Sequence, residues 1–452
     1  MTLFNQVTTG AGSVVRRLRE GGRIRHGPPQ LAVGAWLKQN RRALGIGLLA
    51  LAVLAAYMVY SVTTALWTVI QGVQTPMSEP VPVPRPGENI NVLFLGLDAV
   101  VDSTGRVNLD APLRSSRSRT DTMMLITVDP ATNEAALISI PRDSRCLIPG
   151  RGWEKAAHAH AYGGPTLAMK TVELMLGIDV HYYVRTNYHG VEAIVNALGG
   201  VALEVEKRMY YEDPYQDLLI DLEPGVQVLD GDKSLQYLRY RNEGGDIARI
   251  ARQQKFISAL VDKVTTFSTV FRANALAKEA VKYIDTNMST SEILEYGVLA
   301  ARITDPNIVM ETLPGRVQNV SDNGGPALSY WVLDEAGTRD IVDRLVWRID
   351  KEANAQITVR VLNGSGQAGE AARMAERLAA DGFEVVDIAN APETGHETTQ
   401  IISHIGDQAV SDAVARSVMR YVDEPEALRD VIDDPPADVT VIVGRDFSVA
   451  SR

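Results

Sequence analysis

Cysteine is almost absent from this chain of 452 residues: Cys146 is the only one, so no disulfide can form within the chain. A lone thiol more often packs in a core than reacts, and we expect Cys146 to be buried.

Charge is missing from one long stretch, because no Asp, Glu, Lys or Arg occurs between Arg42 and Glu79. Within that stretch, residues 44–70 are almost wholly apolar or weakly polar, which exceeds the roughly 20 residues that cross a bilayer core.

The uncharged stretch predicts one transmembrane helix at residues 43–70, because it lacks the polar face of a surface helix. Residues 1–42 carry eight Lys and Arg against Glu20 alone, a net charge of +7. Since the whole chain has a net charge of −11, the remainder carries −18. The positive-inside rule therefore predicts a single-pass type II protein of the cell membrane, with residues 1–42 in the cytoplasm and the rest outside. The acidic bulk argues against nucleic acid as a partner.

The part that follows the uncharged stretch is organised as a spacer and two domains. Residues 71–88 contain the run PMSEPVPVPRP, which is typical of a stiff, extended spacer. Residues 89–350 mix apolar strand-like runs with helical segments, which predicts an α/β fold with a mixed central sheet flanked by helices. After a boundary at residues 352–356 the pattern restarts and predicts a small α/β domain at residues 356–447. The predicted strands are 90–98, 122–128, 135–140, 182–186, 309–313 and 439–443, and the predicted helices are 166–176, 191–198, 276–283 and 291–303.

Charged residues gather at the ends of the predicted strands. Asp98 ends the first strand, the run RSRTD precedes the second, and Arg142 follows the third. The run RSRTD contains Arg117, Arg119 and Asp121. Ligand sites in α/β sheets form in the loops beyond strand ends. The carboxylates of Asp98 and Asp121 suit a hard divalent cation, Mg²⁺ or Mn²⁺, that bridges a diphosphate.

A second cluster of arginines lies at residues 235–254, LQYLRYRNEGGDIARIARQQ. The alternation in residues 235–241 favours a short strand, and Gly244 and Gly245 then break the chain. Asp246 can cap the helix that follows, and it shares a face of that helix with Arg249 and Gln253. A strand and a helix joined so tightly direct four side chains at one small volume: Arg239, Arg241, Arg249 and Gln253. Guanidinium groups are well suited to gripping phosphate or pyrophosphate, but a solvated hairpin with local ion pairs gives the same pattern.

The stretch from about Asn89 to Arg348 resembles the LytR-CpsA-Psr family of membrane-anchored cell-wall enzymes. The blocks that carry the resemblance occur in order as VLFLGLD, RTDTMMLITVDP, ISIPRD, AYGGPTLAMKTVELMLGI, YYVRTNYHGVEAIVNALGGV, LEPGVQVLDGDKSLQYLRYRN and DIARIARQQ. The resemblance implies transfer of a glycopolymer of the teichoic acid, capsule or arabinogalactan type from a polyprenyl pyrophosphate carrier to peptidoglycan. It also implies a phosphoryl transfer, in which the muramic acid hydroxyl attacks the sugar-side phosphorus.

The resemblance also implies roles for individual residues. As catalytic residues it implies Asp98, Asp121, Arg119 and Arg142, with Asp98 and Asp121 as ligands of Mg²⁺ or Mn²⁺. As pyrophosphate-binding residues it implies Arg117, Lys155, Arg239, Arg241, Asp246, Arg249 and Gln253. One of the two aspartates is an alternative candidate for the base that deprotonates the acceptor hydroxyl. The prenyl chain needs an apolar tunnel, for which the helices at 166–176 and 191–198 are candidate walls, unless they simply pack in the core.

Two further patterns are weaker signs of a site. His158 and His160 alternate in the run HAHAYGG, but two histidines without a third ligand are insufficient evidence for zinc. Residues 364–369 match the dinucleotide fingerprint G-x-G-x-x-G between a strand and a helix. The roughly ninety residues that follow Gln356 are too few for a paired Rossmann domain. This segment resembles the LytR C-terminal domain instead, and its glycines make the turn from strand to helix.

Three classes of function compete at this point. A glycopolymer phosphotransferase and a membrane-anchored pyrophosphatase would use the same arginines and differ only in the acceptor, a wall hydroxyl or water. The third class is a non-enzymatic regulator of the cell envelope. Residues 1–42 contain no helix-turn-helix pattern, which disfavours a regulator that binds DNA directly.

Overall fold

The computed structural model describes most of the chain between residues 81 and 447. Outside the described residues lie 1–56, 58–59, 62, 65–80, 86, 98–99, 102–106, 109–117, 214–217, 241–244, 265–275, 277, 279–281, 301, 304–307, 322–325 and 448–452. Asp98, Arg117 and Arg241 fall in these gaps, as do nearly all residues of the predicted transmembrane helix. No helix in the described part is long and apolar enough to cross a membrane. All elements below belong to the compact unit Ser61–Arg452.

A mixed six-stranded sheet forms the centre of the larger domain, in agreement with the predicted α/β fold. Its strand order is β13-β8-β1-β4-β5-β14. The strands are β1 (Ile90–Leu97), β4 (Thr120–Asp129), β5 (Glu134–Ser139), β8 (Tyr182–Asn187), β13 (Asp285–Thr286) and β14 (Ile308–Thr312). β1 pairs antiparallel with β4 and parallel with β8, while β5 pairs antiparallel with β4 and parallel with β14. The strands predicted at 90–98, 122–128, 135–140, 182–186 and 309–313 are confirmed.

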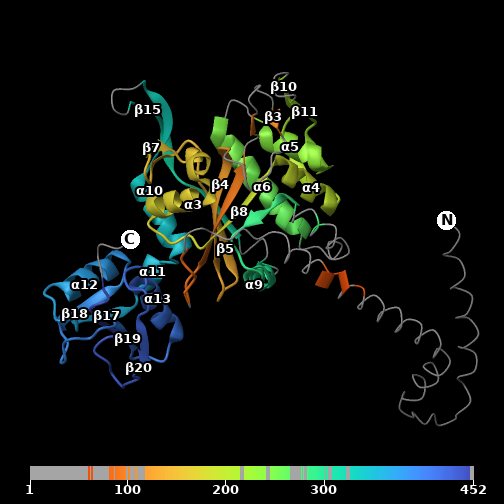
Figure 1. The fold of residues 1–452 in the computed structure, drawn as a ribbon. Coiled ribbons are helices and arrows are strands. Elements are labelled where there is room, and N and C mark those ends of the chain that lie inside the picture. Colours follow the sequence, from red (N-terminus) through yellow and green to blue (C-terminus); the bar gives the residue numbers. More distant parts are fainter. Residues whose placement is uncertain are drawn as a thin grey trace, which may run out of the picture. The chain divides into compact units, whose positions relative to one another are not determined.

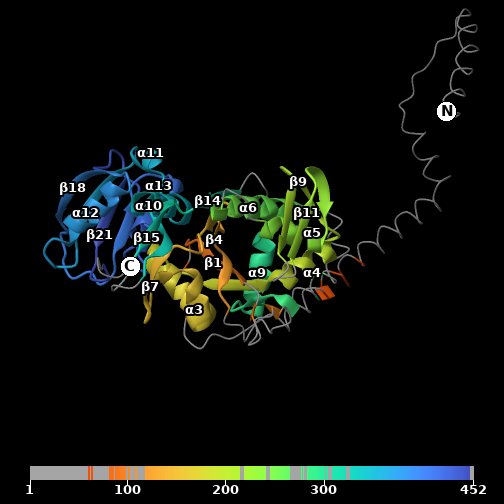
Figure 2. The same ribbon diagram turned by 90° about the horizontal axis from the view of Figure 1, so that it is seen from above.

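Helices cover both faces of this sheet, and Figure 2 shows α3 and α6 on opposite sides of β1 and β4. The helices are α3 (Ala157–Leu176), α4 (Tyr188–Leu198), α5 (Gly231–Arg239), α6 (Gly245–Val264), α9 (Thr290–Ala300), α10 (Glu335–Ile341), a π-helical turn at Val342–Val346 and α11 (Lys351–Asn354). Leu93, Leu95 and Leu125 are fully buried in one core with Met169 and Val172 of α3. Since side chains alternate along a strand, the neighbouring residues of β1 and β4 face α4, α5 and α6.

Five antiparallel pairs of short strands surround the sheet. They are β2 (Val100–Val101) with β3 (Val107–Asn108), β6 (Arg145–Ile148) with β7 (Gly152–Lys155), β9 (Val201–Val205) with β12 (Gly225–Leu229), β10 (Met209–Asp213) with β11 (Leu218–Leu222), and β15 (Gly315–Val320) with β16 (Leu328–Leu333). Cys146 of β6 is 3% exposed, as expected, and burial raises the pKa of its thiol to about 12. Such a thiol stays protonated and unreactive at neutral pH.

A second sheet, with the order β18-β17-β21-β19-β20, forms the C-terminal domain, drawn in blue in Figure 1. Its elements are β17 (Thr358–Asn363), α12 (Glu370–Ala380), β18 (Glu384–Asn390), β19 (Gln400–Ser403), α13 (Gln408–Val418), β20 (Glu426–Arg429) and β21 (Val439–Val443). It has its own core, in which Val361, Met374 and Val441 are fully buried. Gly366 and Gly369 have φ angles of 80° and 87°, so the glycines of the fingerprint make the turn between β17 and α12.

One prediction about secondary structure is wrong. Residues 235–239 do not form a strand, because they belong to α5, whose N-terminus is capped by Asp230 accepting from the Lys233 amide. Ser234 and Tyr237 are fully buried three residues apart, which is the spacing of a helix face and not of a strand. The helix predicted at 166–176 is confirmed, although α3 begins earlier, at Ala157, and has a kink at Gly163 and Gly164.

Candidate functional site

The charged residues predicted at strand ends meet at one edge of the central sheet. Leu97, the last residue of β1, pairs with Thr120 at the start of β4 and with Asn187 at the end of β8. The carboxyl end of β5 reaches the same edge, because the Ile140 amide donates to the Met123 carbonyl at 2.9 Å. Side chains just beyond β1, β5 and β8 are therefore brought next to Asp121.

Asp121 is the centre of the polar contacts at this edge. Its Oδ1 lies 2.5 Å from Nη1 of Arg142, and its Oδ2 accepts a hydrogen bond of 2.6 Å from the Tyr188 hydroxyl. The side chain of Asp121 is 11% exposed and that of Arg142 is 26% exposed. Because the pair is mostly shielded from water, its electrostatic interaction is stronger than that of a surface ion pair.

Arg249 approaches the same carboxylate from α6. Its Nη2 donates to the backbone carbonyl of Asp121 at 3.2 Å, and its Nη1 lies 3.8 Å from Asp121 Oδ1. The residue is only 2% exposed, so its charge depends on nearby anions for compensation. Gln253, one turn further along α6, is 8% exposed. The predicted shared face of Arg249 and Gln253 is confirmed, whereas the side chain of Asp246 lies outside the described part.

Arg239 joins the cluster through Tyr188. Its guanidinium carbon lies 5.1 Å from the centre of the Tyr188 ring, within the range of a cation–π contact. Tyr188 thus touches Asp121 with its hydroxyl and Arg239 with its ring. Three arginines, Arg142, Arg239 and Arg249, gather around a single described carboxylate. Guanidinium groups gathered in this way suit the binding of a phosphate group.

Lys155 and Arg119 lie at the margin of this cluster. Lys155 Nζ is 2.9 Å from Asp143 Oδ1, and the backbone nearby is fixed by a hydrogen bond of 3.0 Å from the Ala157 amide to the Arg142 carbonyl. Lys155 is therefore held close to the loop that carries Arg142. Arg119 is exposed two residues before Asp121, and within the described ranges it has no ion pair.

An apolar cavity of about 270 Å³ adjoins the charged cluster. Asp121, Tyr188 and Gln253 line it, together with Phe94, Met124 and Val184 from the sheet. The helices contribute Val191, Ile194 and Val195 of α4, Leu238 of α5, and Phe256, Ile257 and Leu260 of α6. The cavity is thus polar beside Asp121, which Arg142 and Arg249 contact, and apolar along the sheet. This arrangement suits a ligand with a charged head and a hydrocarbon tail.

The cavity tests the prediction about tunnel walls. The helix predicted at 191–198 lines it, as expected. The helix predicted at 166–176 does not, because α3 packs on the opposite face of the sheet with Leu93 and Leu95. The third wall is α6, whose apolar residues follow Arg249 and Gln253 on the same helix. One helix therefore supplies both a cation for the head of the ligand and apolar surface for its tail.

A buried polar network supports the segment that leads into β4. His160 is fully buried, with Nδ1 2.8 Å from the Ser118 carbonyl and Nε2 3.2 Å from Arg185 Nη1. Arg185 Nε in turn lies 2.6 Å from Asp285 Oδ2. Burial, opposed by the bond to Ser118 and reinforced by the charge of Arg185, lowers the pKa of His160 to about 4. A neutral His160 therefore donates to Ser118 and accepts from Arg185.

The donor set of the site fits a divalent cation only in part. Among the described residues, no three His, Cys, Asp or Glu side chains lie close enough together to hold a metal ion. His158, for example, pairs with Glu154 at 2.7 Å. Mg²⁺, however, often takes one or two carboxylates from the protein and its other oxygens from phosphates and water. Asp121 can supply one such carboxylate.

One residue at the site, Tyr188, and one beside the site, Arg252, were not predicted from the sequence. Tyr188 follows the predicted strand at 182–186, so the rule that drew attention to Asp121 and Arg142 at strand ends could have found it. Arg252 is 7% exposed and donates to the Tyr240 carbonyl, which ties α6 to the end of α5. Burial lowers the pKa of Arg252, and its contacts are with the backbone rather than with the cavity.

Comparison with known proteins gives matches to both domains. The model described as the LytR_cpsA_psr family matches residues 64–345, and that described as LytR cell envelope-related transcriptional attenuator matches residues 356–447. The polyisoprenyl-teichoic acid–peptidoglycan teichoic acid transferase TagT of Bacillus subtilis is 34% identical over 209 residues, 46% of this chain and 62% of TagT. The probable cell wall biosynthesis protein LcpB of Corynebacterium glutamicum is 35% identical over 223 residues, 48% of this chain and 51% of LcpB.

Among solved structures, TagT bound to LIIa-WTA has a TM-score of 0.46 and 27% identity, and the match covers 60% of this chain and 95% of that one. The matches to TagT and LcpB span only about half to three fifths of the length of those curated relatives.

Proposed function

The chain belongs to the LytR-CpsA-Psr family, and we propose that it is a phosphotransferase that moves a glycopolymer from a polyprenyl pyrophosphate carrier to peptidoglycan. One observation carries the proposal: an apolar cavity of about 270 Å³ adjoins a cluster of three arginines around Asp121. Polyprenyl pyrophosphate has the matching chemistry, a long hydrocarbon tail and a dianionic or trianionic head. The name of the relative TagT, a teichoic acid transferase, supports the same class of reaction.

The proposed reaction is a displacement at the sugar-side phosphorus. The acceptor hydroxyl forms a new P–O bond, the bond to the bridging oxygen breaks, and polyprenyl phosphate leaves. Arg142, Arg239 and Arg249 bind the diphosphate and stabilise the negative charge on its non-bridging oxygens in the transition state. The apolar cavity orients the leaving group, because the prenyl chain fixes the direction in which the diphosphate lies.

The two predicted aspartates receive different roles in this proposal. The two carboxylate oxygens of Asp121 already accept contacts from a guanidinium and a phenolic hydroxyl. We therefore assign to Asp121 the orientation of Arg142 and Arg249 and one ligand position for Mg²⁺ or Mn²⁺. Such a cation would add charge neutralisation to the diphosphate when bound. Asp98 is left as the candidate base for the acceptor hydroxyl.

The location of the reaction is part of the same proposal. Residues 43–70 would anchor the protein in the membrane, and the charge of +7 on residues 1–42 would keep that segment in the cytoplasm. The site would then lie on the outer side, where both the lipid-linked glycan and peptidoglycan are available.

A cavity-filling variant tests whether the prenyl chain occupies the cavity. Ile194→Trp narrows the cavity from α4, so KM should rise about tenfold or more for donors with long prenyl chains and much less for donors with one or two isoprene units. Leu174→Trp is the matched control, because Leu174 is 55% exposed on α3, the helix that does not line the cavity. Release of polyprenyl phosphate is the readout. An unchanged preference for chain length in Ile194→Trp would refute the assignment of the cavity.

A further inference from the structure

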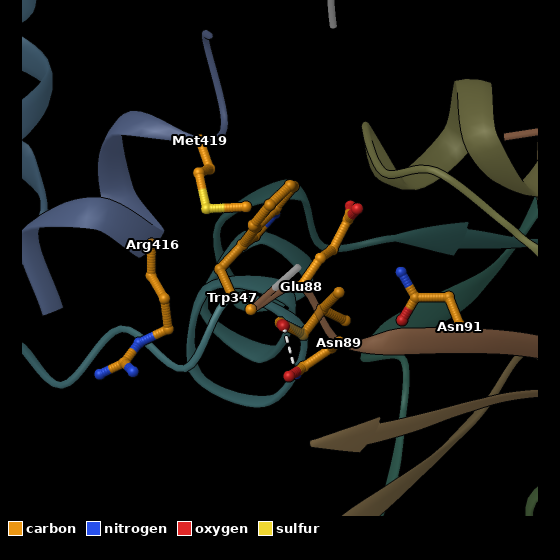
Figure 3. Close-up of a pocket in the computed structure, with 8 residues that line it drawn as sticks. Glu88, Asn89, Asn91, Trp347, Arg416 and Met419 are labelled. Atoms are coloured by element: carbon orange, nitrogen blue, oxygen red, sulfur yellow. Dashed lines mark hydrogen bonds between the residues drawn. The ribbon is translucent and has the colours of Figure 1, made fainter. Parts of the chain in front are cut away.

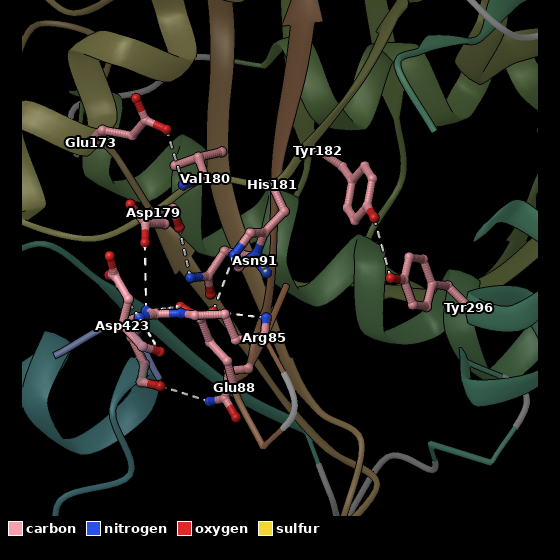
Figure 4. A network of polar contacts seen from close by, with 12 residues as sticks. Arg85, Glu88, Asn91, Glu173, Asp179, Val180, His181, Tyr182, Tyr296 and Asp423 are labelled. Atoms are coloured by element: carbon pink, nitrogen blue, oxygen red, sulfur yellow. Dashed lines mark hydrogen bonds and ion pairs between the residues drawn. The ribbon is translucent and has the colours of Figure 1, made fainter. Parts of the chain in front are cut away.

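The two domains are joined by a fixed set of contacts. Arg420, which follows α13, has Nη2 2.8 Å from Asp343 Oδ1 of the π-helical turn and Nη1 2.7 Å from Asp381 Oδ1 after α12. Arg85 donates to Asp423 at 3.2 Å while also pairing with Glu88 at 2.9 Å (Figure 4). Of these ion pairs, Arg420–Asp343 and Arg85–Asp423 cross between the two domains and hold them together.

Apolar contacts accompany these ion pairs. Trp347 lies beside Met419 and Arg416 of the C-terminal domain, next to Asn89, whose Nδ2 donates to the Val346 carbonyl at 2.7 Å (Figure 3). Trp347 is only 8% exposed, and the guanidinium carbon of Arg420 lies 5.7 Å from its ring. The junction is therefore packed on one side of Trp347.

On its other side Trp347 borders a cleft of about 460 Å³, here called the junction cleft, which the site described above does not use. The end of α3, helix α10 with the π-helical turn, helix α12 and the segment after α13 all contribute to it. Its charged and aromatic lining consists of Arg339, Arg377, Arg420, Glu335, Asp343, Trp347 and Tyr421. The volume lies within the ~300–1,000 Å³ typical of ligand pockets, and the mixture of aromatic and polar groups is also typical.

Charge and hydrogen bonding in the junction cleft are incompletely satisfied by the protein. Arg420 and Asp343 neutralise each other, but Arg339 and Arg377 are exposed, and neither has a carboxylate within ion-pair distance in the described part of the chain. Arg377 instead lies over the ring of Tyr421 at 5.3 Å. Thr338 is 8% exposed, and its buried Oγ1 has no hydrogen-bond partner among the described residues. A buried hydroxyl without a partner is costly and points to a ligand that supplies one.

We propose that the junction cleft binds a phosphate- or carboxylate-bearing saccharide of the glycan substrate, with Arg339 from one domain and Arg377 from the other as its charged contacts. Arginine is suited to both anions because its planar fork matches their geometry. Tyr421 and Trp347 supply apolar surface, and Thr338 supplies a hydrogen bond. The identity of the glycan rests on the function proposed above, whereas the preference for an anion rests on the arginines.

Helix α3 sets the distance between the junction cleft and the reaction. Its first residue, Ala157, donates to the Arg142 carbonyl, and its last residue, Leu176, lines the cleft. A straight helix of twenty residues is about 30 Å long, and the kink at Gly163 and Gly164 shortens this span. The cleft is therefore assigned a sugar further along the polymer and not the sugar attached to the diphosphate. This makes the contribution of the cleft dependent on the length of the glycan.

Kinetics with donors of two lengths test the proposal on the full chain. The variant Arg339→Ala/Arg377→Ala should raise KM about tenfold for a polymeric lipid-linked donor and leave kcat and KM unchanged for a lipid-linked disaccharide. Arg373→Ala is the matched control, since Arg373 lies one turn before Arg377 on α12, is exposed and pairs with Glu370 at 3.1 Å outside the cleft. Melting temperatures should agree among the three proteins, because the substituted side chains are exposed.

Binding without turnover identifies the source of the anion. Calorimetric titration with lipid-free wall teichoic acid should show binding that the double variant loses and that added salt weakens, whereas soluble peptidoglycan strands should bind the wild type and the double variant alike. Loss of peptidoglycan binding alone in the double variant would place the acceptor in the cleft and contradict the proposal. Unchanged KM values together with unchanged binding of both polymers would overturn the proposal. A wild-type protein that turns over neither donor would instead count against the transferase function, so the two failures are distinguishable.

Discussion

Replacing Arg249 by lysine separates the geometry of the charge from the charge itself. Lysine keeps the positive charge near Asp121 but cannot reproduce the two contacts that the guanidinium makes, 3.2 Å from the backbone carbonyl and 3.8 Å from Oδ1. If Arg249 binds a diphosphate oxygen in the transition state, its loss resembles the removal of one oxyanion donor, which costs about 2.7–4 kcal/mol. Turnover should then fall roughly a hundredfold or more.

Stability should respond much less than turnover. The lost hydrogen bond to Asp121 contributes about 0.5–1.5 kcal/mol to the free energy of unfolding, which lowers Tm by only a few degrees in a domain of this size. Arg252→Lys is the matched control, because Arg252 is also buried on α6 but donates to the Tyr240 carbonyl. It should lose a similar amount of stability and keep turnover within about threefold.

The assay measures the release of polyprenyl phosphate from a lipid-linked diphosphate glycan by the wild type, Arg249→Lys and Arg252→Lys. The thermal unfolding of the same three proteins is measured in parallel. Equal losses of turnover in Arg249→Lys and Arg252→Lys would mean that the arginines act through folding alone. Full turnover in Arg249→Lys would remove Arg249 from the diphosphate site.

The remaining predictions concern charge, protons, domains and topology. Asp121→Asn leaves Arg142 and Arg249 without their shared anion and should reduce turnover at least a hundredfold, while a variant with full activity would contradict the role of Asp121. Burial lowers the pKa of His160 from 6.5 to about 4, so the unfolded chain binds a proton at a higher pH than the folded chain does. The free energy of unfolding should therefore fall as the pH drops from about 6.5 to 4. In denaturant titrations, the free energy of unfolding of His160→Gln should depend less on pH over this range. An unchanged dependence on pH would show that His160 is not its cause. The fragment Asn89–Lys351 should still cleave a short lipid-linked diphosphate but melt at a lower temperature, because Asp343 loses Arg420; a folded, inactive fragment would contradict this. A reporter fused after Arg452 should be active only outside the cytoplasm, and activity inside would overturn the proposed orientation.

The central sheet and the meeting of Asp121 with Arg142 could be predicted because both depend on local signals. Apolar strands with clear ends place the residues that follow them at one sheet edge, whatever the details of packing. The strand predicted at residues 235–239 is wrong, because that prediction followed the alternation of aromatic and basic residues and left out the cap at Asp230. That cap and the burial of Ser234 and Tyr237 favour a helix. The prediction that Arg239 and Arg249 lie in one cluster is confirmed, because Arg249 contacts Asp121 directly and Arg239 contacts Tyr188, which donates to Asp121.

The parts that could not be predicted depend on contacts between distant segments. Phe256, Ile257 and Leu260 have the pattern of core residues, and only the fold shows that they face a cavity rather than filled space. The packing of α3 on the opposite face likewise follows from the register of Leu93 and Leu95. The junction cleft requires residues near 340 and near 377 to meet, and no motif in either segment indicates the other.

The stoichiometry of transfer distinguishes a phosphotransferase from a pyrophosphatase. Purified full-length protein is incubated with a lipid-linked diphosphate glycan, with and without peptidoglycan, and both polyprenyl phosphate and wall-attached glycan are quantified. A phosphotransferase should release one polyprenyl phosphate for each glycan joined to the wall through a phosphodiester, with little release when peptidoglycan is absent. Equal release in both conditions, with free phosphorylated glycan as the product, would show that water is the acceptor and that the protein is a pyrophosphatase.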